Sequence, residues 1–547
     1  MRGVFFLEDA TVNRPDDAFH VYDTTLRDGA QREGISYSVA DKLAVSRLLD
    51  DLGVGFIEGG WPGALPKDTE FFSRARTELE LQSAQLVAFG STRRADSAVT
   101  DDPQVRALLD SGADVITLVA KSDVRHVAEA LRTTREENLA MVSDTVAYLV
   151  GEGRRVFLDL EHFFDGYHHD RDYGLRVLDA AITAGADVGV LCDTNGGMLP
   201  LGIHRVVGEV LERSGGVRLG IHCQDDTGCA VANTLAAVEA GVTHVQCTAN
   251  GYGERTGNAD LFAVVANLET KLDLRVLPRG RLTELVRVSH ALAEIANIAP
   301  DTHQPYVGVS AFAHKAGLHA SAIKVSPDLY NHLDPAVVGN DMRVLVTEMA
   351  GRASIELKGR ELGYDLAEDR EALGQVLQRV KDLEARGYSF EAADASFELL
   401  LRDITEPDSR RYFTVESWRT IVEQRPGGEI VSEATVKVRA GGHRIVATGE
   451  GNGPVNALDN GLRQALGQIF PELESLELVD YKVRILEGSE GTDAVTRVLV
   501  ETSDGKGEWD TIGVHENVIA ASWVALEEAI TYGLLRAGRV ADEDEER

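Results

Sequence analysis

The sequence predicts a (β/α)8 barrel, followed by a helical subdomain and a C-terminal α+β domain. Between residues 19 and 274, eight short apolar runs that end in polar residues alternate with helical segments. Several of these segments end at glycine, which suits the turn from a helix into the next strand. Eight β–α units in a stretch of this length are typical of a closed barrel. A doubly wound sheet is the alternative, but no glycine-rich dinucleotide loop follows the first run.

We expect the barrel to occupy residues 1–275. Helical segments such as 39–53 and 234–241 separate the apolar runs. The expected strands lie at residues 20–23, 55–60, 86–90, 114–120, 156–161, 188–193, 219–223 and 244–249.

The rest of the chain changes character twice. Residues 276–395 read as a helical linker subdomain with a loop-rich, proline-containing centre. Residues 396–547 predict strand, Gly-Gly turn, strand and helix, and then three strands and a helix. This similarity indicates an internal duplication of a ββ(β)α unit. We interpret the glycines before Pro454 as a strand-to-helix turn, with the proline at the first helical position, and not as a phosphate loop.

Composition excludes several functional classes. The chain has 547 residues, of which 44% are hydrophobic and 26% charged, as in a folded enzyme of several domains. Its formal net charge of −34 repels phosphate backbones and anionic membranes, so we expect no nucleic-acid or membrane partner. We find neither a run of about 18 apolar residues nor a signal peptide. Four cysteines without a C-x-x-C pair predict a reduced, cytoplasmic protein.

Polar residues gather where the expected strands end, which is the catalytic face of a barrel of this type. Carboxylate, imidazole and amide groups together suit Mg²⁺ or Mn²⁺, with Zn²⁺ as an alternative, and such an ion can polarise a carbonyl group. Arg27 next to Asp28 is suited to stabilise negative charge on an oxygen. Strand-end salt bridges and caps are the alternative for any one residue. The residues concerned are Arg27, Asp28, Glu58, Asp159, Glu161, His162, Asp193, Thr194, Asn195, His222, Gln224, Asp225, Asp226 and Asn250.

Six phrases carry a resemblance to a known family: DTTLRDGAQ, IEGGWPG, DTNGG, HCQDDTG, NGYGERTGNADL and AFAHKAGLHASA. Together they resemble the metal-dependent acyl-CoA-condensing enzymes related to 2-isopropylmalate synthase and homocitrate synthase. The phrases IEGGWPGALPKDTEFF and EHFFDGYHHD are more similar to the citramalate-forming branch. The resemblance covers nearly the whole chain and implies condensation of acetyl-CoA with a 2-oxo acid, with pyruvate expected.

The resemblance also implies a metal site. The R-D-G pattern places a metal-binding aspartate at Asp28, and the family's His-x-His segment falls on His222 and Gln224. Glutamine therefore stands where the family has a second histidine, and its amide oxygen is a harder and weaker ligand than imidazole. We expect Asp28, His222, Gln224 and water to hold the ion, with Asn250 nearby.

For catalysis, the resemblance assigns Arg27 to the stabilisation of an oxyanion and Thr194 to the carboxylate of the 2-oxo acid. Arg27 also counts as a substrate-binding residue, and Glu161 matches a glutamate of the catalytic centre. His319 and Tyr330, in the helical subdomain, match a histidine and a tyrosine that complete the active site in this family.

The C-terminal segment looks like the regulatory domain of the family. We expect a homodimer that responds to isoleucine, or to leucine, because citramalate leads towards isoleucine. Other functions stay open at this point: 2-isopropylmalate or homocitrate synthesis, a C–C lyase on the same barrel, or a non-catalytic amino-acid sensor. Glu161, His319 and Tyr330 disfavour the last two.

Overall fold

The N-terminal part of the chain is a closed barrel of eight parallel strands in sequence order. The computed structural model describes residues 17–347, 350–367, 369–406, 411–486 and 494–539. The barrel strands are β1 His20–Asp23, β2 Phe56–Gly60, β3 Gln85–Ser91, β4 Val115–Lys121, β5 Arg155–Glu161, β6 Val188–Asp193, β7 Arg218–Cys223 and β8 His244–Cys247. The predicted fold class is confirmed, and the doubly wound alternative is wrong because β1 pairs with both β2 and β8.

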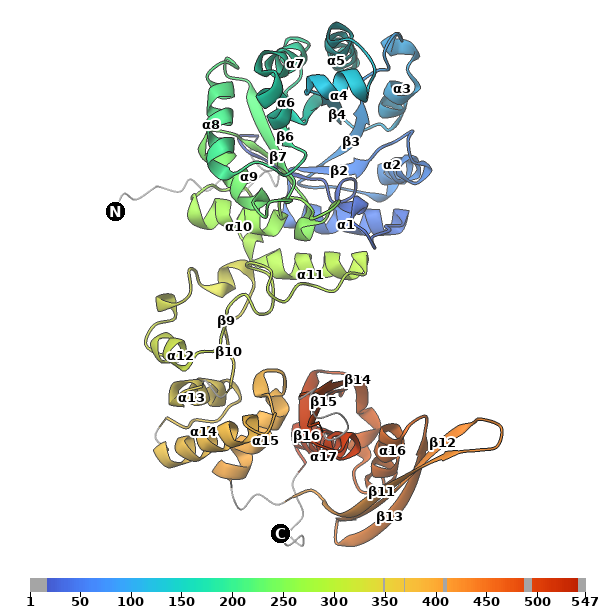
Figure 1. The fold of residues 1–547 in the computed structure, drawn as a ribbon, viewed down its shortest axis with the longest axis vertical. Helices are drawn as coiled ribbons and strands as arrows, with labels where there is room; N and C mark the ends of the chain where they lie inside the picture. The colour runs from blue at the N-terminus through green and yellow to red at the C-terminus, as the bar shows by residue number, and fades with distance from the viewer. Residues whose placement is uncertain (1–16, 348–349, 368, 407–410, 487–493, 540–547) are drawn as a thin grey trace. The chain divides into compact units, whose positions relative to one another are not determined.

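Helices surround these strands, as Figure 1 shows in blue to green. Two short helices, α4 and α6, are inserted after β4 and β5, and α11 packs on α1. The helices are α1 Val39–Leu52, α2 Pro66–Glu78, α3 Pro103–Asp110, α4 Val124–Glu129, α5 Arg135–Gly151, α6 Phe163–His169, α7 Arg171–Thr183, α8 Pro200–Leu211, α9 Ala230–Glu239, α10 Leu261–Lys271 and α11 Leu285–Ala296.

The inside of the barrel is a packed core and not a channel. Its side chains interdigitate between the strands, and a larger apolar layer fills the space between the strands and the helices. Buried rings such as Tyr22, Phe56 and Phe157 belong to the cluster that fills the inside of the barrel. Chemistry is therefore confined to the ends of the strands.

The chain divides into two compact units, residues 1–312 with 333–341, and residues 313–332 with 342–547. The second unit begins with short elements and helices: β9 Ala313–His314, α12 Gly317–Ile323, β10 Arg343–Val344, α13 Arg352–Glu361, α14 Arg370–Glu384 and α15 Asp394–Thr405. The domain boundaries predicted at residues 275 and 395 stay predictions.

The C-terminal part contains two similar halves. Each is a three-stranded antiparallel sheet followed by a helix, so the first half has one more strand, β11, than we predicted. Pro454 is the first residue of α16, as predicted. The first half is β11 Thr414–Gln424, β12 Ile430–Ala440, β13 His443–Gly451 and α16 Pro454–Leu466, and the second is β14 Glu477–Ile485, β15 Thr496–Ser503, β16 Glu508–His515 and α17 Val518–Arg536.

Within the described ranges, α17 alone is long and apolar enough to cross a membrane by length and composition. It is not an unbroken apolar run, since it contains Glu527 and Glu528. Its side chains Trp523, Leu526 and Ile530 are buried in the core that both halves share. The packing of α17 is therefore that of a core helix of this domain.

Candidate active site

A cavity of about 600 Å³ opens at the carboxyl ends of the barrel strands. Seven of the predicted site residues line it, and they come from β1, β5, β6 and β7 or the turns that follow them. Those seven are Arg27, Asp28, Asp159, Glu161, Thr194, His222 and Gln224. The structure thus brings together groups that are far apart in the sequence.

Asp28 and His222 form the centre of this group. Their Oδ2 and Nε2 atoms are 3.2 Å apart, and both side chains are buried. Burial alone would raise the pKa of Asp28, but the charge of Arg27 and the hydrogen bond with His222 hold it well below its usual range. Burial opposes the charged form of His222 in the same way, yet Asp28 raises the pKa of the imidazole. The pair is therefore arranged to hold a positive charge between its two facing atoms.

The Nδ1 edge of the His222 ring is held by Gln246, which is held in turn by Asp159. Nδ1 donates to Oε1 of Gln246 at 2.8 Å, and Nε2 of Gln246 donates to Oδ1 of Asp159 at 2.9 Å. These two hydrogen bonds leave Nε2 of His222 directed at Asp28. Histidines that ligate a metal are commonly oriented by a hydrogen bond at their other ring nitrogen. Burial and the nearby Glu58 raise the pKa of Asp159 to about 7.

Two buried carbonyl oxygens are available as ligands for a cation. Oε1 of Gln224 and Oδ1 of Asn258 accept no hydrogen bond in the described structure, which is costly for buried polar atoms. A β-bridge joins Gln224 to Asn258, and Nε2 of Gln224 lies 3.3 Å from Nε2 of His222 and 3.5 Å from Oδ2 of Asp28. One imidazole, one carboxylate and two amide oxygens fit a divalent cation of the Mg²⁺ or Mn²⁺ type.

Among the described residues, no three histidine, cysteine, aspartate or glutamate side chains are grouped so that they could hold a metal ion. The reason is chemical. Only Asp28 and His222 are of these types here, and the two remaining donors are amides. With glutamine at position 224, the site has two amide donors in addition to one carboxylate and one imidazole.

The structure does not bring Asn250 to this group, which corrects our expectation. Its backbone is left-handed, with a φ of 55°, and its amide faces α11. Oδ1 of Asn250 accepts from Oγ of Ser289 at 2.7 Å and from Nε2 of Gln304 at 3.1 Å. Asn258, which follows in the same glycine-rich phrase, is the asparagine that forms a β-bridge with Gln224 and donates a hydrogen bond to Asp28.

Arg27 is held rigidly beside Asp28. Its Nε donates to Oε1 of Glu58 at 2.5 Å, its Nη1 lies 3.3 Å from Oδ2 of Asp28, and its guanidinium lies 3.9 Å from the centre of the Phe89 ring. Burial opposes the charge, but Glu58 and Asp28 raise the pKa of Arg27 further above its already high value. Glu58 also accepts from Oγ1 of Thr24 at 2.6 Å, so this glutamate is an anchor for Arg27.

Thr194 and Glu161 lie on the opposite wall of the cavity. Oγ1 of Thr194 accepts from the backbone N–H of His162 at 2.8 Å, so its own hydroxyl hydrogen is free to be donated. Glu161 forms an ion pair with Lys121 at the end of β4. The sequence analysis missed Lys121, although a lysine at a strand end is a visible signal.

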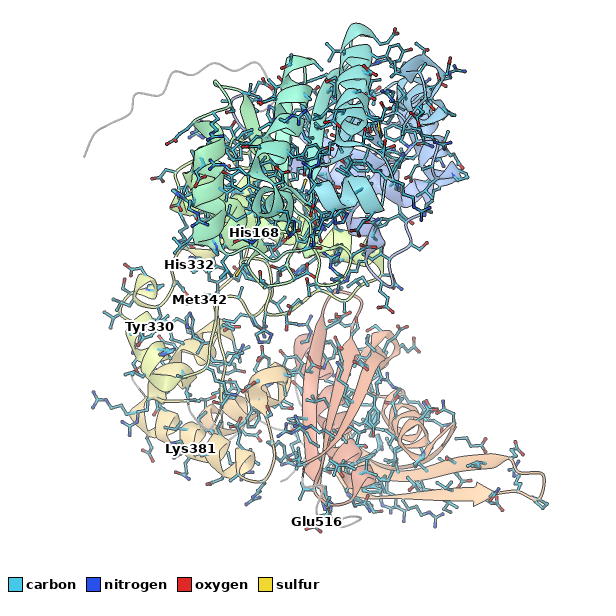
Figure 2. All side chains as sticks on the ribbon, turned by 45° about the horizontal axis from the view of Figure 1, so that its top comes forward. His168, Tyr330, His332, Met342, Lys381 and Glu516 are labelled. Atoms are coloured by element: carbon cyan, nitrogen blue, oxygen red, sulfur yellow. The ribbon has the colours of Figure 1, made fainter. Side chains whose placement is uncertain are left out.

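His319 and Tyr330 belong to the second unit and not to the barrel. His319 is on α12, and Tyr330, labelled in Figure 2, follows a short 3-10 turn after that helix. Their rings are stacked with centres 4.2 Å apart. The structure brings these two residues to each other, and their role towards the barrel stays a prediction.

Comparison with known proteins covers the chain in three parts. The family described as HMGL-like matches residues 18–292, the homocitrate synthase post-HMGL domain-like family matches 306–388, and the LeuA allosteric (dimerisation) domain matches 391–534. An (R)-citramalate synthase of Streptomyces coelicolor is 70% identical over 96% of this chain and 98% of its own length. One of Synechocystis is 49% identical over 94% of this chain and 96% of its own. A 2-isopropylmalate synthase of Methanocaldococcus jannaschii is 30% identical over 95% of each chain.

Proposed function

We propose how the barrel rim carries out the reaction of the family to which this chain belongs: it is a member of the (R)-citramalate synthase family of HMGL-like enzymes. The chain condenses acetyl-CoA with pyruvate, and hydrolysis of the thioester gives citramalate and CoA, a step of isoleucine biosynthesis. The observation that supports our assignment of roles is the group formed by Asp28, His222 and two unsatisfied amide oxygens next to Arg27.

In this proposal, Asp28, His222, Gln224 and Asn258 hold the divalent cation. When bound, the cation supplies Lewis-acid polarisation of the keto group of pyruvate. Mg²⁺ or Mn²⁺ suits the oxygen-rich donors, with Zn²⁺ as the alternative. The hydrogen bonds from His222 through Gln246 to Asp159 keep the imidazole in the required orientation.

The other rim residues bind the substrate and stabilise charge. The hydroxyl of Thr194 donates to the carboxylate of pyruvate, because its oxygen is already occupied by the N–H of His162. Arg27 stabilises the negative charge that grows on the keto oxygen as the C–C bond forms, and its anchor Glu58 fixes it in advance. Glu161 supplies a carboxylate of the barrel rim that accepts the methyl proton of acetyl-CoA. The stacked His319 and Tyr330 of the second unit are proposed as further acid–base groups.

Release of free thiol from acetyl-CoA, measured with a panel of 2-oxo acids, tests this function. We expect the highest kcat/KM with pyruvate and a lower value with 2-oxobutyrate and 2-oxoisovalerate. A higher kcat/KM with 2-oxoisovalerate would reassign the chain to 2-isopropylmalate synthesis. Thiol release without any 2-oxo acid would instead indicate simple thioester hydrolysis.

The C-terminal domain is proposed to bind isoleucine, with leucine as the alternative, and to inhibit the barrel. The match to the LeuA allosteric domain and the two similar halves support this role. Inhibition would be a coupling free energy of about 1–3 kcal/mol between two sites. We expect isoleucine to bind the intact protein with a measurable heat and to lower its rate, and truncation after residue 395 to remove both effects. No heat and no rate change with isoleucine, leucine or valine would leave dimerisation as the function of this domain.

We also propose that the chain is a homodimer in the cytoplasm. Strand β14 is at the edge of its sheet and exposes Val479, Val483 and Ile485. An exposed apolar edge strand is a surface that soluble proteins usually cover by pairing. Sedimentation should give twice the mass of one chain, and the change of Val483 and Ile485 to Lys should give a monomer.

A further inference from the structure

Gln104, Trp61, Phe89 and Arg27 form a row of contacting side chains. The last three line the cavity, and Gln104 lies outside it. Nε1 of Trp61 donates to Oε1 of Gln104 at 2.8 Å. The indole meets the ring of Phe89 edge to face, with centres 5.3 Å apart and an angle of 83° between the planes. The guanidinium of Arg27 lies over the Phe89 ring, 3.9 Å from its centre. The ring of Phe89 thus contacts both a residue of the reaction centre and Trp61.

The backbone of Trp61 is fixed independently of its ring. Its N–H donates to Oδ2 of Asp68 at 2.8 Å, and Oδ1 of Asp68 is paired with the buried Lys42. Lys42 also donates to the carbonyl of Gly59 at 2.9 Å. Gly60 has a φ of +136°, and a Cβ there would lie 2.4 Å from the carboxylate of Asp68. The turn after β2 therefore fixes the backbone of Trp61, from which the indole extends to Gln104 and Phe89.

We propose that Trp61 is a positioning residue that sets the size of the pocket for the side chain of the 2-oxo acid, by holding the ring of Phe89 against Arg27. Phe89 is 5% exposed, and the indole of Trp61 packs against its ring. Trp61, Phe89 and Arg27 all line the cavity that contains Asp28 and His222. A pocket narrowed in this way accepts the methyl group of pyruvate and excludes the isopropyl group of 2-oxoisovalerate.

This inference rests on the proposed function, because it concerns the choice among 2-oxo acids. A hydrophobic pocket discriminates by about 10-fold or more for each added methylene group. A smaller side chain at position 61 should therefore change the ratio of kcat/KM values between pyruvate and larger 2-oxo acids. A purely structural role of Trp61 would lower all rates together.

The test measures kcat/KM with pyruvate, 2-oxobutyrate and 2-oxoisovalerate in a set of variants. Trp61→Leu should reduce the preference for pyruvate over 2-oxoisovalerate by about 10-fold. Trp61→Phe keeps an aromatic edge against Phe89 and should reduce it less.

Gln104 provides a matched pair of variants in case Trp61→Leu does not fold. Gln104→Glu keeps an acceptor for the indole N–H and should retain the preference of the unmodified protein. Gln104→Met removes the acceptor and should lower the preference in the direction of Trp61→Leu. An unchanged ratio in Trp61→Leu, or in Gln104→Met if the first variant is unfolded, overturns the inference. If the unmodified protein does not use pyruvate, the proposed function fails instead, and the two failures are distinct.

Discussion

The barrel rim and the C-terminal domain both shield carboxylates from solvent, fully at Asp28 and partly at Glu528, but they surround them with different partners. Asp28 faces Arg27 and His222, and its pKa is held low although burial opposes this. Glu528 on α17 accepts from Oγ of Ser396 and otherwise faces the acidic Glu527 and Asp403, so burial raises its pKa to about 7. A buried acid that stays charged beside unsatisfied oxygens prepares a site for a cation. A partly buried acid driven towards its neutral form affects stability, and Glu528 itself lines a cavity of about 540 Å³ in the C-terminal part.

The two regions also use close packing differently. At the rim, the buried carbonyl oxygens of Gln224 and Asn258 accept no hydrogen bond and are available to a ligand. In the C-terminal halves, Gly449 and Gly513 leave no room: a Cβ would lie 2.3 Å from the backbone nitrogen of Gly461 in α16 and 1.9 Å from the carbonyl oxygen of Ala521 in α17. Substitutions should therefore impair chemistry in the first region and stability in the second.

The largest effect should come from the central pair of the rim. Asp28→Ala or His222→Ala should lower turnover on the order of 10³-fold or more, because each removes a cation ligand and leaves its partner without a counter-charge. Initial rates and the metal content of the purified protein measure this. Full activity with unchanged metal content in either variant would reject the assignment. Glu528→Gln, by contrast, should leave turnover intact.

The next effect concerns the two glycines. Gly449→Ala and Gly513→Ala should each destabilise the C-terminal domain by about 3 kcal/mol, since the new methyl group meets helix backbone that cannot yield. Denaturant unfolding followed by tryptophan fluorescence measures the change. Gly427→Ala is the control, because a Cβ there has nothing within 4 Å. Equal stability of all three variants would contradict the close approach of helix and sheet.

Glu528 should make stability depend on pH. Its pKa in the folded domain, about 7, lies above the ordinary value of 4.5, so its ionisation opposes folding. The destabilisation is absent below about pH 4.5, grows as the pH rises and is complete above about pH 7. Glu528→Gln keeps an acceptor for Ser396 and should be more stable than the unmodified protein at pH 8, by about 2–3 kcal/mol, and equally stable near pH 4.5. The exposed Glu477→Gln should show no such difference, and a constant effect of Glu528→Gln at all pH values would contradict this account.

The smallest effect is expected from Gln224→His, which restores the imidazole that the family pattern has at this position. Zn²⁺ or Mn²⁺ should bind about 10-fold more tightly, because imidazole is the stronger ligand for these ions. Titration calorimetry with the metal alone measures this without reference to activity. If Gln224→His and Gln224→Ala both bind metal like the unmodified protein, Gln224 is not a ligand.

Much of the barrel and its rim could be predicted from the sequence because each strand is a short apolar run that ends in a polar residue. Asp28 and His222 were found in this way, since the position after a strand determines the face of the barrel. Asn258 was missed because it follows a glycine-rich turn, and only the β-bridge to Gln224 brings it to the rim. No pattern local to residues 250–258 distinguishes its amide from that of Asn250.

Other features depend on contacts that no local pattern contains. Strand β11 was missed because its side chains are mostly polar and exposed, unlike those of β12. The orientation of His222 by Gln246 and Asp159 joins three strands of the barrel, and sequence spacing alone does not reveal it. The stacking of His319 on Tyr330 depends in the same way on the turn after α12.

The glycines at equivalent places in the two C-terminal halves record how this domain arose. The same spacing separates Gly449 from Gly513, Ala457 from Ala521 and Gly461 from Ala525, and in each half these positions form one helix-on-sheet contact. Tandem duplication of a single small gene segment accounts for a match that extends to individual atoms. Such a segment, as a separate chain, would have covered its apolar core by pairing with its own copy. Fusion would then have turned a symmetric pair into one polypeptide, whose halves were free to diverge while the glycines stayed under the same constraint.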